Sequence, residues 1–158
     1  METEKTIELS KYLSTIGFLK MLKRRFSSEE AFELAKEGFA NFMIESYKLI
    51  LGETKPNSQD RFDRFRDHYE EAAAKKPYVS IITSEPKILK VRFDRCPFSE
   101  ALAHYHLGDM VYAFCLSDPA FTKVVLPGVR FERSHEIAKG SDHCDHTWIF
   151  EKRGENGN

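Results

Sequence analysis

The chain has 158 residues, with 24 basic and 25 acidic side chains and a formal net charge of −1, and this length is typical of one domain that buries its own core. Its charges are interspersed and no apolar run approaches the ~18 residues that cross a bilayer, so we expect neither a nucleic-acid nor a membrane partner. The charged first residues lack the apolar stretch of a secretory signal and the cysteine count of 3 is odd, so we expect reduced thiols and a cytoplasmic location.

The first half of the sequence has the apolar spacing of helices. We expect one helix over residues 7–26 and a second that ends at Gly52. Ser27 and Glu30 have the spacing of a capping box, which predicts where the second helix begins. A third helix is expected to stop before Pro77, because proline cannot continue a helix.

After Pro77 the pattern changes to the two-residue alternation of β-strands. Strands are expected over residues 78–83, 88–95, 129–137 and 143–151, and the last two are close enough to form a hairpin. Short helices are expected over residues 97–107, 109–116 and 118–125, the last with Asp118 as its cap and Pro119 in its first turn. The predicted fold is α+β, with a helical N-terminal half packed on a small antiparallel sheet of about four strands. We expect a single domain over residues 1–152 and a disordered tail over 153–158.

Cys96 lies at the end of the second predicted strand and directly before Pro97. Proline is favourable at the first helical position, so Cys96 is expected to cap the next helix. The free N–H groups and the positive end of the helix dipole would then lower the pKa of its thiol. This makes Cys96 a candidate nucleophile. The alternative is a small buried residue at a strand end.

Cys115 lies beside Phe114 and Leu116 in a predicted helix, a context typical of the core. Asp118 is three positions further on, and can therefore face the same way and orient or deprotonate a neighbouring group. We include both among the candidate catalytic residues. The alternative for Asp118 is that it only caps the helix before Pro119.

A third cysteine lies in a run of acids and imidazoles, Asp142-His143-Cys144-Asp145-His146. A thiol, an imidazole and a carboxylate can provide a nucleophile, its base and an orienting group, so Asp142, His143 and Cys144 are candidates. Strand alternation places Asp142, Cys144, His146 and Trp148 on one face, and Trp148 indicates that this face is buried or lines a pocket. The alternative is a polar strand end around one buried cysteine.

The same residue types can bind zinc. A zinc site here would combine two ligands from residues 143–146 with Cys96 and Cys115. Zinc ligands usually occur as close pairs, whereas these cysteines are isolated in the sequence, so we expect no metal.

The three cysteine contexts together resemble the L-2-amino-thiazoline-4-carboxylic acid hydrolase family. The shared elements are Cys96-Pro97, Cys115-Leu116-Ser117-Asp118 and Gly140-Ser141-Asp142-His143-Cys144. They occur in order between residues 88 and 150, after a helical first half. The resemblance implies a small α+β hydrolase that opens a cyclic amidine or thiazoline-type ring at a C–N or C–S bond. Its partner would be a small-molecule substrate, and we expect no cofactor.

In the expected reaction the thiolate of Cys96 or Cys144 attacks carbon C2 of the ring. A proton comes from Asp142, Asp118 or His143. Direct attack by water, with the cysteines only shaping the pocket, is a variant. The candidates for substrate binding are Arg92, Arg133, His146 and Trp148, of which the arginines would bind a carboxylate.

Two other functions fit the same sequence. One is a small-molecule binding domain without chemistry, similar to sensor domains that combine helices with a small sheet. The other is a domain with a structural zinc ion. The phenylalanine-rich helices are compatible with a homo-oligomer, although a core explains them equally well.

Overall fold

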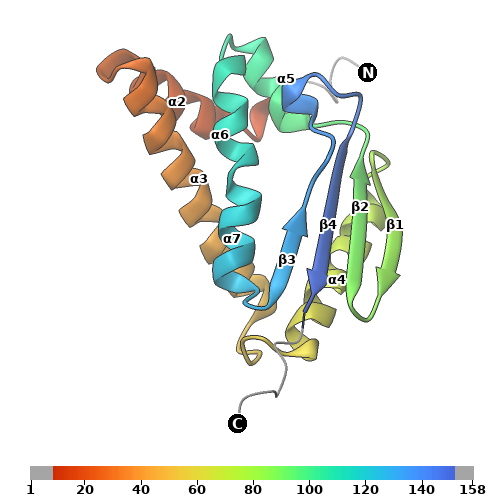
Figure 1. Ribbon diagram of the computed structural model, residues 1–158. Helices are drawn as coiled ribbons and strands as arrows, with labels where there is room; N and C mark the ends of the chain where they lie inside the picture. Colours follow the sequence, from red (N-terminus) through yellow and green to blue (C-terminus); the bar gives the residue numbers. More distant parts are fainter. Residues whose placement is uncertain (1–8, 152–158) are drawn as a thin grey trace.

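The computed structural model describes residues 9–151 and has the predicted α+β architecture (Figure 1). The predicted tail, residues 153–158, and the first two residues of the helix expected over 7–26 lie outside the described residues. The antiparallel sheet has the order β1-β2-β4-β3. Its strands are β1 (Val79–Glu85), β2 (Ile88–Phe93), β3 (Val129–Glu132) and β4 (Cys144–Phe150).

Three long helices precede the sheet, as predicted: α2 (Leu13–Arg25), α3 (Ser28–Leu51) and α4 (Gln59–Lys75). The capping box at the start of α3 is confirmed. The Glu30 N–H donates to Ser27 Oγ at 3.3 Å, and the Ser27 N–H donates to Glu30 Oε2 at 3.0 Å. Gly52 ends α3 with a φ of 58°, a conformation that a residue without a Cβ adopts easily.

The short helices after β2 are α5 (Pro97–His104), η1 (Gly108–Met110), α6 (Val111–Cys115) and α7 (Ser117–Val125). The helix expected over 97–107 is therefore shorter than predicted, and His106 just beyond it has a φ of 59°. The prediction that Asp118 caps α7 is wrong, because its side chain makes no cap hydrogen bond and Leu116 holds the cap position. Only Leu116 separates α6 from α7, so Asp118 lies inside an almost continuous helix.

β3 is shorter than the strand expected over 129–137, and the 3-10 helix η2 (Ile137–Lys139) follows it. The physical reason is the side chain of Asp145. Its Oδ1 accepts the N–H of Ser134 at 2.8 Å and the N–H of His135 at 2.5 Å. These two N–H groups are satisfied by a carboxylate instead of by a neighbouring strand, and the chain leaves the sheet.

The buried face of the sheet is the face of β4 that carries Trp148, as predicted from the strand alternation. Trp148 is fully buried and His146 and Phe150 nearly so, and in the register Val91 faces His146 while Phe93 faces Cys144. Two helices cover this face. From α4, Phe65 contacts Trp148 with ring centroids 5.0 Å apart, and from α7, Thr122 Oγ1 accepts the indole N–H at 3.0 Å.

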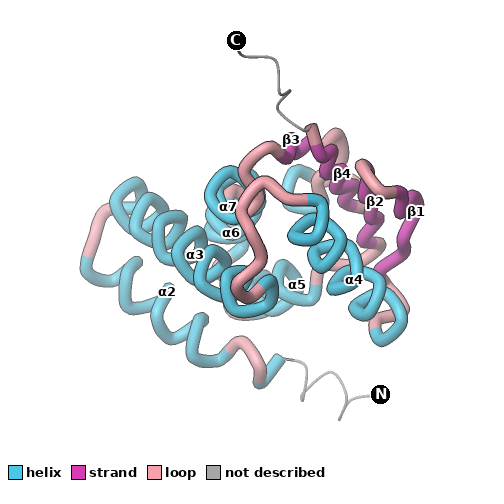
Figure 2. The backbone as a smooth tube through the Cα atoms, turned by 90° about the horizontal axis from the view of Figure 1, so that it is seen from below, coloured by secondary structure: helices cyan, strands magenta, loops and turns pink. Residues whose placement is uncertain are grey.

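A second group of buried residues packs α2, α5 and α6 together at the other end of the molecule, and α3 contributes to both groups. Figures 1 and 2 both show α3 alongside α6 and α7, with α4 against the sheet. Cys96 and Cys115 pack against the second group, whereas Cys144 begins β4 of the sheet. The cysteines therefore lie where the two groups of buried residues meet. No helix within residues 9–151 is long and apolar enough to cross a membrane.

Candidate functional site

The centre of the candidate site is a buried ion pair between α7 and the segment after β3. Arg133 Nη1 lies 3.0 Å from Asp118 Oδ2, and the exposed fractions of the two side chains are 8% and 11%. The same nitrogen donates to the carbonyl oxygen of Cys115 at 3.2 Å. Arg133 Nη2 lies 2.9 Å from Glu136 Oε2. One guanidinium thus holds the end of α6, the first turn of α7 and the segment before η2 together.

The environment of Asp118 changes its acidity. Burial raises the pKa of this carboxyl, Arg133 lowers it and Glu136 raises it, with a net value of about 7. A carboxyl group with this pKa exists in both protonation states at neutral pH. It can therefore give a proton to a reacting group, or take one from it, without a change of conformation.

His146 lies beside Asp118, with Nε2 3.8 Å from Asp118 Oδ2. Burial and, to a smaller extent, the charge of Arg133 lower the pKa of His146 to about 3, so the imidazole is neutral. Its ring lies between Phe93 and Phe131, with centroid distances of 5.0 and 5.3 Å. Among the described residues, Nδ1 is buried without a hydrogen-bond partner. Such an atom is unusual in a folded protein, and the contact of His146 with a substrate stays a prediction.

The sulfur atoms of Cys96 and Cys144 each accept a backbone N–H group. Cys96 caps α5, as predicted, and accepts the N–H of Ser99 at 3.4 Å. Cys144 accepts the N–H of Ile137, at the start of η2, at 3.2 Å. These donors would stabilise a thiolate once it has formed.

The three thiols are close enough to influence one another electrostatically. Cys144 raises the pKa of Cys96, and both of them raise the pKa of Cys115. Arg133 lowers the pKa of both Cys115 and Cys144, and Asp118 raises it. Residues 96, 115, 118, 133 and 144, which are far apart in the sequence, therefore form one electrostatic cluster.

The expected low pKa of Cys96 is wrong. Burial is the largest influence and raises the pKa of this thiol, outweighing the N–H groups of Ser99 and Phe98 that lower it. Burial also raises the pKa of Cys144, and that of Cys115 to about 12. At neutral pH all three groups are thiols, so a thiol of this cluster needs a neighbouring base to become a nucleophile.

Asp142 and His143 lie at the edge of this cluster. His143 Nδ1 is 2.5 Å from Asp142 Oδ1, and 84% of the Asp142 side chain is exposed. The His143 ring stacks on His135 with centroids 4.5 Å apart. β4 begins only at Cys144, so the prediction that Asp142 shares the buried face of the strand is wrong. The roles of Asp142 and His143 in catalysis stay predictions.

Three of the predicted substrate-binding residues have other partners. The side chain of Arg92 is 40% exposed and its Nε lies 2.6 Å from Asp94 Oδ1. Trp148 is fully buried, and its only polar atom is bonded to Thr122. Trp148 is therefore part of the core in this structure, and Arg133 is occupied by two carboxylates. Their contact with a substrate stays a prediction.

The sequence interpretation missed three residues that influence the site. Glu136 pairs with Arg133, and the Tyr47 hydroxyl donates to the Tyr69 hydroxyl at 2.9 Å. Burial has the largest effect and raises the pKa of both tyrosines, and the charge of Asp118 raises it as well, so both hydroxyls lie within electrostatic range of Asp118. No local motif marks these residues, because their relation to Asp118 exists only after folding.

The zinc alternative receives no support from the geometry. Within residues 9–151, no three or more His, Cys, Asp or Glu side chains are arranged to hold a metal ion. His146, which lies beside the ion pair, has a carboxylate and three aromatic rings as neighbours.

Comparison with known proteins agrees with the resemblance noted in the sequence. The family model for L-2-amino-thiazoline-4-carboxylic acid hydrolase matches residues 8–148, a range that includes all three thiols and the Asp118–Arg133 pair. No curated protein matches the chain.

Proposed function

The chain belongs to the L-2-amino-thiazoline-4-carboxylic acid hydrolase family, and we propose that it opens a small cyclic amidine or thiazoline-type ring at the cluster around Asp118. One observation carries this proposal. A carboxyl group with a pKa of about 7 lies within electrostatic reach of the partly exposed thiol of Cys144, whose sulfur atom accepts a backbone N–H group. These are the parts that a thiol-dependent hydrolysis needs.

Cys144 is our choice for the nucleophile. Its sulfur accepts the N–H of Ile137, and the charge of Arg133 lowers its pKa against the effect of burial. The carboxylate form of Asp118 is the base that we assign to it. Proton transfer to Asp118 leaves a thiolate beside Arg133 and the Ile137 N–H, so the new charge has two stabilising neighbours. Cys96 is the second candidate, because its sulfur also accepts a backbone N–H group, that of Ser99.

The reaction then consumes one molecule of water. The thiolate adds to C2 of the ring, the carbon between sulfur and nitrogen, and a C–N or C–S ring bond to C2 breaks. The departing heteroatom takes the proton from Asp118. Water adds to the enzyme-bound carbon and expels the thiol, which regenerates the protein. Asp118 thus acts first as base and then as acid, a double role suited to a pKa near neutrality.

Arg133 is a positioning residue in this proposal. Its guanidinium is occupied by Asp118, Glu136 and the carbonyl of Cys115, so it sets the orientation and acidity of Asp118 instead of binding a substrate carboxylate.

Incubation of the full chain with L-2-amino-thiazoline-4-carboxylic acid tests the proposal. A ring-opened product that is heavier by one water molecule, detected by mass spectrometry, is the expected result. If the compound raises the melting temperature of the protein but no product forms, the chain is a binding domain and the proposal is wrong. Related cyclic amidines, assayed in parallel, identify the substrate class.

A further inference from the structure

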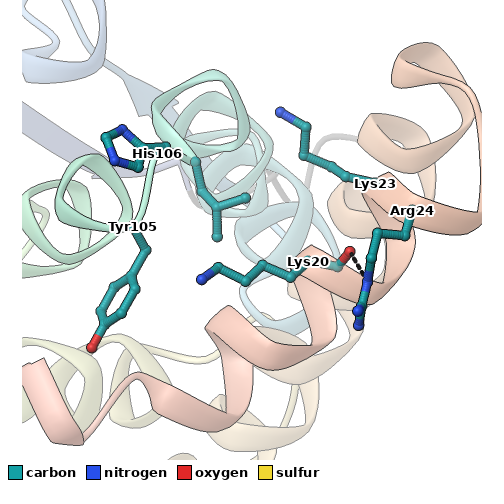
Figure 3. Close-up of a pocket in the computed structure, with 6 residues that line it drawn as sticks. Lys20, Lys23, Arg24, Tyr105 and His106 are labelled. Carbon is teal, nitrogen blue, oxygen red and sulfur yellow. Dashed lines mark hydrogen bonds between the residues drawn. The ribbon is translucent and has the colours of Figure 1, made fainter.

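A hollow on the surface lies between α2 and the segment that links α5 to η1 (Figure 3). Its volume is about 320 Å³. The residues that line it are Lys20, Lys23 and Arg24 of α2, and Tyr105, His106 and Leu107 after α5. None of these residues belongs to the Asp118 cluster.

The walls of the hollow combine apolar surface with positive charge. Leu107 is nearly fully buried and packs with the core residues beneath. Lys20 Nζ lies 4.9 Å from the centroid of the Tyr105 ring. In Figure 3 the side chains of Lys20 and Lys23 both extend from α2 toward the segment that carries Tyr105 and His106.

The charges here are not balanced. Lys23 Nζ pairs with Asp109 Oδ2 at 2.5 Å. In the described part of the chain, that carboxylate is the only one paired with the three cations of the hollow. Arg24 Nε donates to the carbonyl oxygen of Lys20 at 3.3 Å. This acceptor carries no formal charge, so it does not neutralise the guanidinium. Three cations against one acid leave a surplus of positive charge beside an apolar wall.

The segment opposite α2 is held in an uncommon conformation. His106 has a φ of 59° and is not a glycine, a backbone conformation that costs roughly 1–2 kcal/mol for most residues. It follows the end of α5 and lies between Tyr105 and Leu107, which both line the hollow. Strain of this kind is common where a loop is shaped for binding.

We propose that this hollow binds a small organic anion, a carboxylate or phosphate group carried on a flat apolar body. The ammonium groups of Lys20 and Lys23 would contact the anionic group, while Tyr105 and Leu107 would contact the apolar part. The proposal is independent of the proposed hydrolase activity.

Three probes test it: phenyl phosphate, inorganic phosphate and phenol, each titrated into the ¹⁵N-labelled full chain at constant ionic strength. We expect phenyl phosphate to shift the amide signals of residues 20–24 and 105–109 at millimolar concentration. It should bind several-fold more tightly than inorganic phosphate, because only phenyl phosphate uses the apolar wall. Binding of phenol as tight as that of phenyl phosphate would overturn the proposal, as would the lack of any shift with phenyl phosphate.

Variants separate this site from general attraction to a protein surface. Lys20→Gln should weaken phenyl phosphate binding about three-fold and Lys20→Gln/Lys23→Gln about ten-fold, the range expected for partly exposed charges. Lys90→Gln removes an exposed charge from β2 and serves as the matched control, with unchanged binding. The NMR spectrum of the double variant also shows whether it is folded. If the double variant and Lys90→Gln bind phenyl phosphate with equal affinity, the proposal is contradicted. Thiazoline turnover is measured separately, so a failure of either proposal leaves the other intact.

Discussion

Arg133 holds Asp118 through a buried contact of 3.0 Å between Nη1 and Oδ2. The two residues come from opposite sides of the site, Asp118 from α7 and Arg133 from the segment that leaves the sheet after β3. The same guanidinium also neutralises Glu136 at 2.9 Å. The orientation and acidity of Asp118 therefore depend on this guanidinium.

Loss of that cation should destabilise the protein strongly. Arg133→Leu removes the ion-pair partner of the buried Asp118 carboxylate and leaves Glu136 paired only with Lys139, and we expect a loss of about 3–5 kcal/mol in the free energy of unfolding. Urea denaturation measures the change. Arg92→Leu is the matched control, because the pair between Arg92 and Asp94 is exposed, and it should change stability little. Equal effects of the two substitutions would show that the buried pair has no special importance.

Asp118 should make stability depend on pH in a particular direction. Burial raises its pKa from 3.8 to about 7, so the folded protein binds a proton that the unfolded chain releases above pH ~4. The contribution of Asp118 to stability is therefore greatest below pH ~4 and decreases as the pH rises toward 7. The difference in unfolding free energy between the wild type and Asp118→Asn, measured by urea denaturation from pH 4 to 8, should follow this curve. A constant difference would contradict the raised pKa.

Asp145 and Asp142 lie on either side of Cys144 in the sequence but should differ in their contribution to the stability of the fold. Asp145→Ala leaves the N–H groups of Ser134 and His135 without an acceptor, and we expect a loss of about 1–3 kcal/mol. Burial raises the pKa of Asp145, but hydrogen bonds from Ser134 and His135 outweigh it and the pKa is lowered. Its stabilising contribution is thus present above pH ~4 and is lost as the pH falls below that value. Asp142→Ala should have little effect on thermal unfolding, and the reverse order would refute this interpretation of the loop.

Two glycines offer a contrast in stability. Gly128 has a φ of 86°, and a Cβ there would overlap the side-chain amide of Asn57, so Gly128→Ala should destabilise the turn before β3 by ~1 kcal/mol or more. Gly38 lies within α3 with open space around it. Gly38→Ala should stabilise the helix by roughly 0.5–1 kcal/mol. Calorimetry of both variants checks these opposite signs, and a Gly128→Ala variant as stable as the wild type would show that the turn can relax.

Local features of the fold could be predicted from the sequence. The capping box of Ser27 and Glu30 and the buried alternation of His146, Trp148 and Phe150 depend on residues a few positions apart. The position of Cys96 as a helix cap was equally local. Its pKa was not, because burial by other parts of the chain outweighs the effect of the cap.

The candidate site was predictable only in its residue types. Cys115, Asp118 and Cys144 were identified from motifs. The partners that set their chemistry, Arg133 and Glu136, come from a segment predicted as a continuous strand. That strand ends early because Asp145 accepts two backbone N–H groups across the loop. Such a contact depends on the folded chain and has no signature in the sequence.

The central claim, that a thiol of this cluster attacks the ring, is tested most directly by the hydrolysis of L-2-amino-thiazoline-4-carboxylic acid by single cysteine variants. Cys144→Ser should lower kcat by about 10²-fold or more. Cys115→Ser should retain most of the activity, because the pKa of Cys115 is raised to about 12 and no step is assigned to it. Circular dichroism verifies that each variant is folded. Full activity in both Cys144→Ser and Cys96→Ser would contradict the account, because no candidate nucleophile would remain.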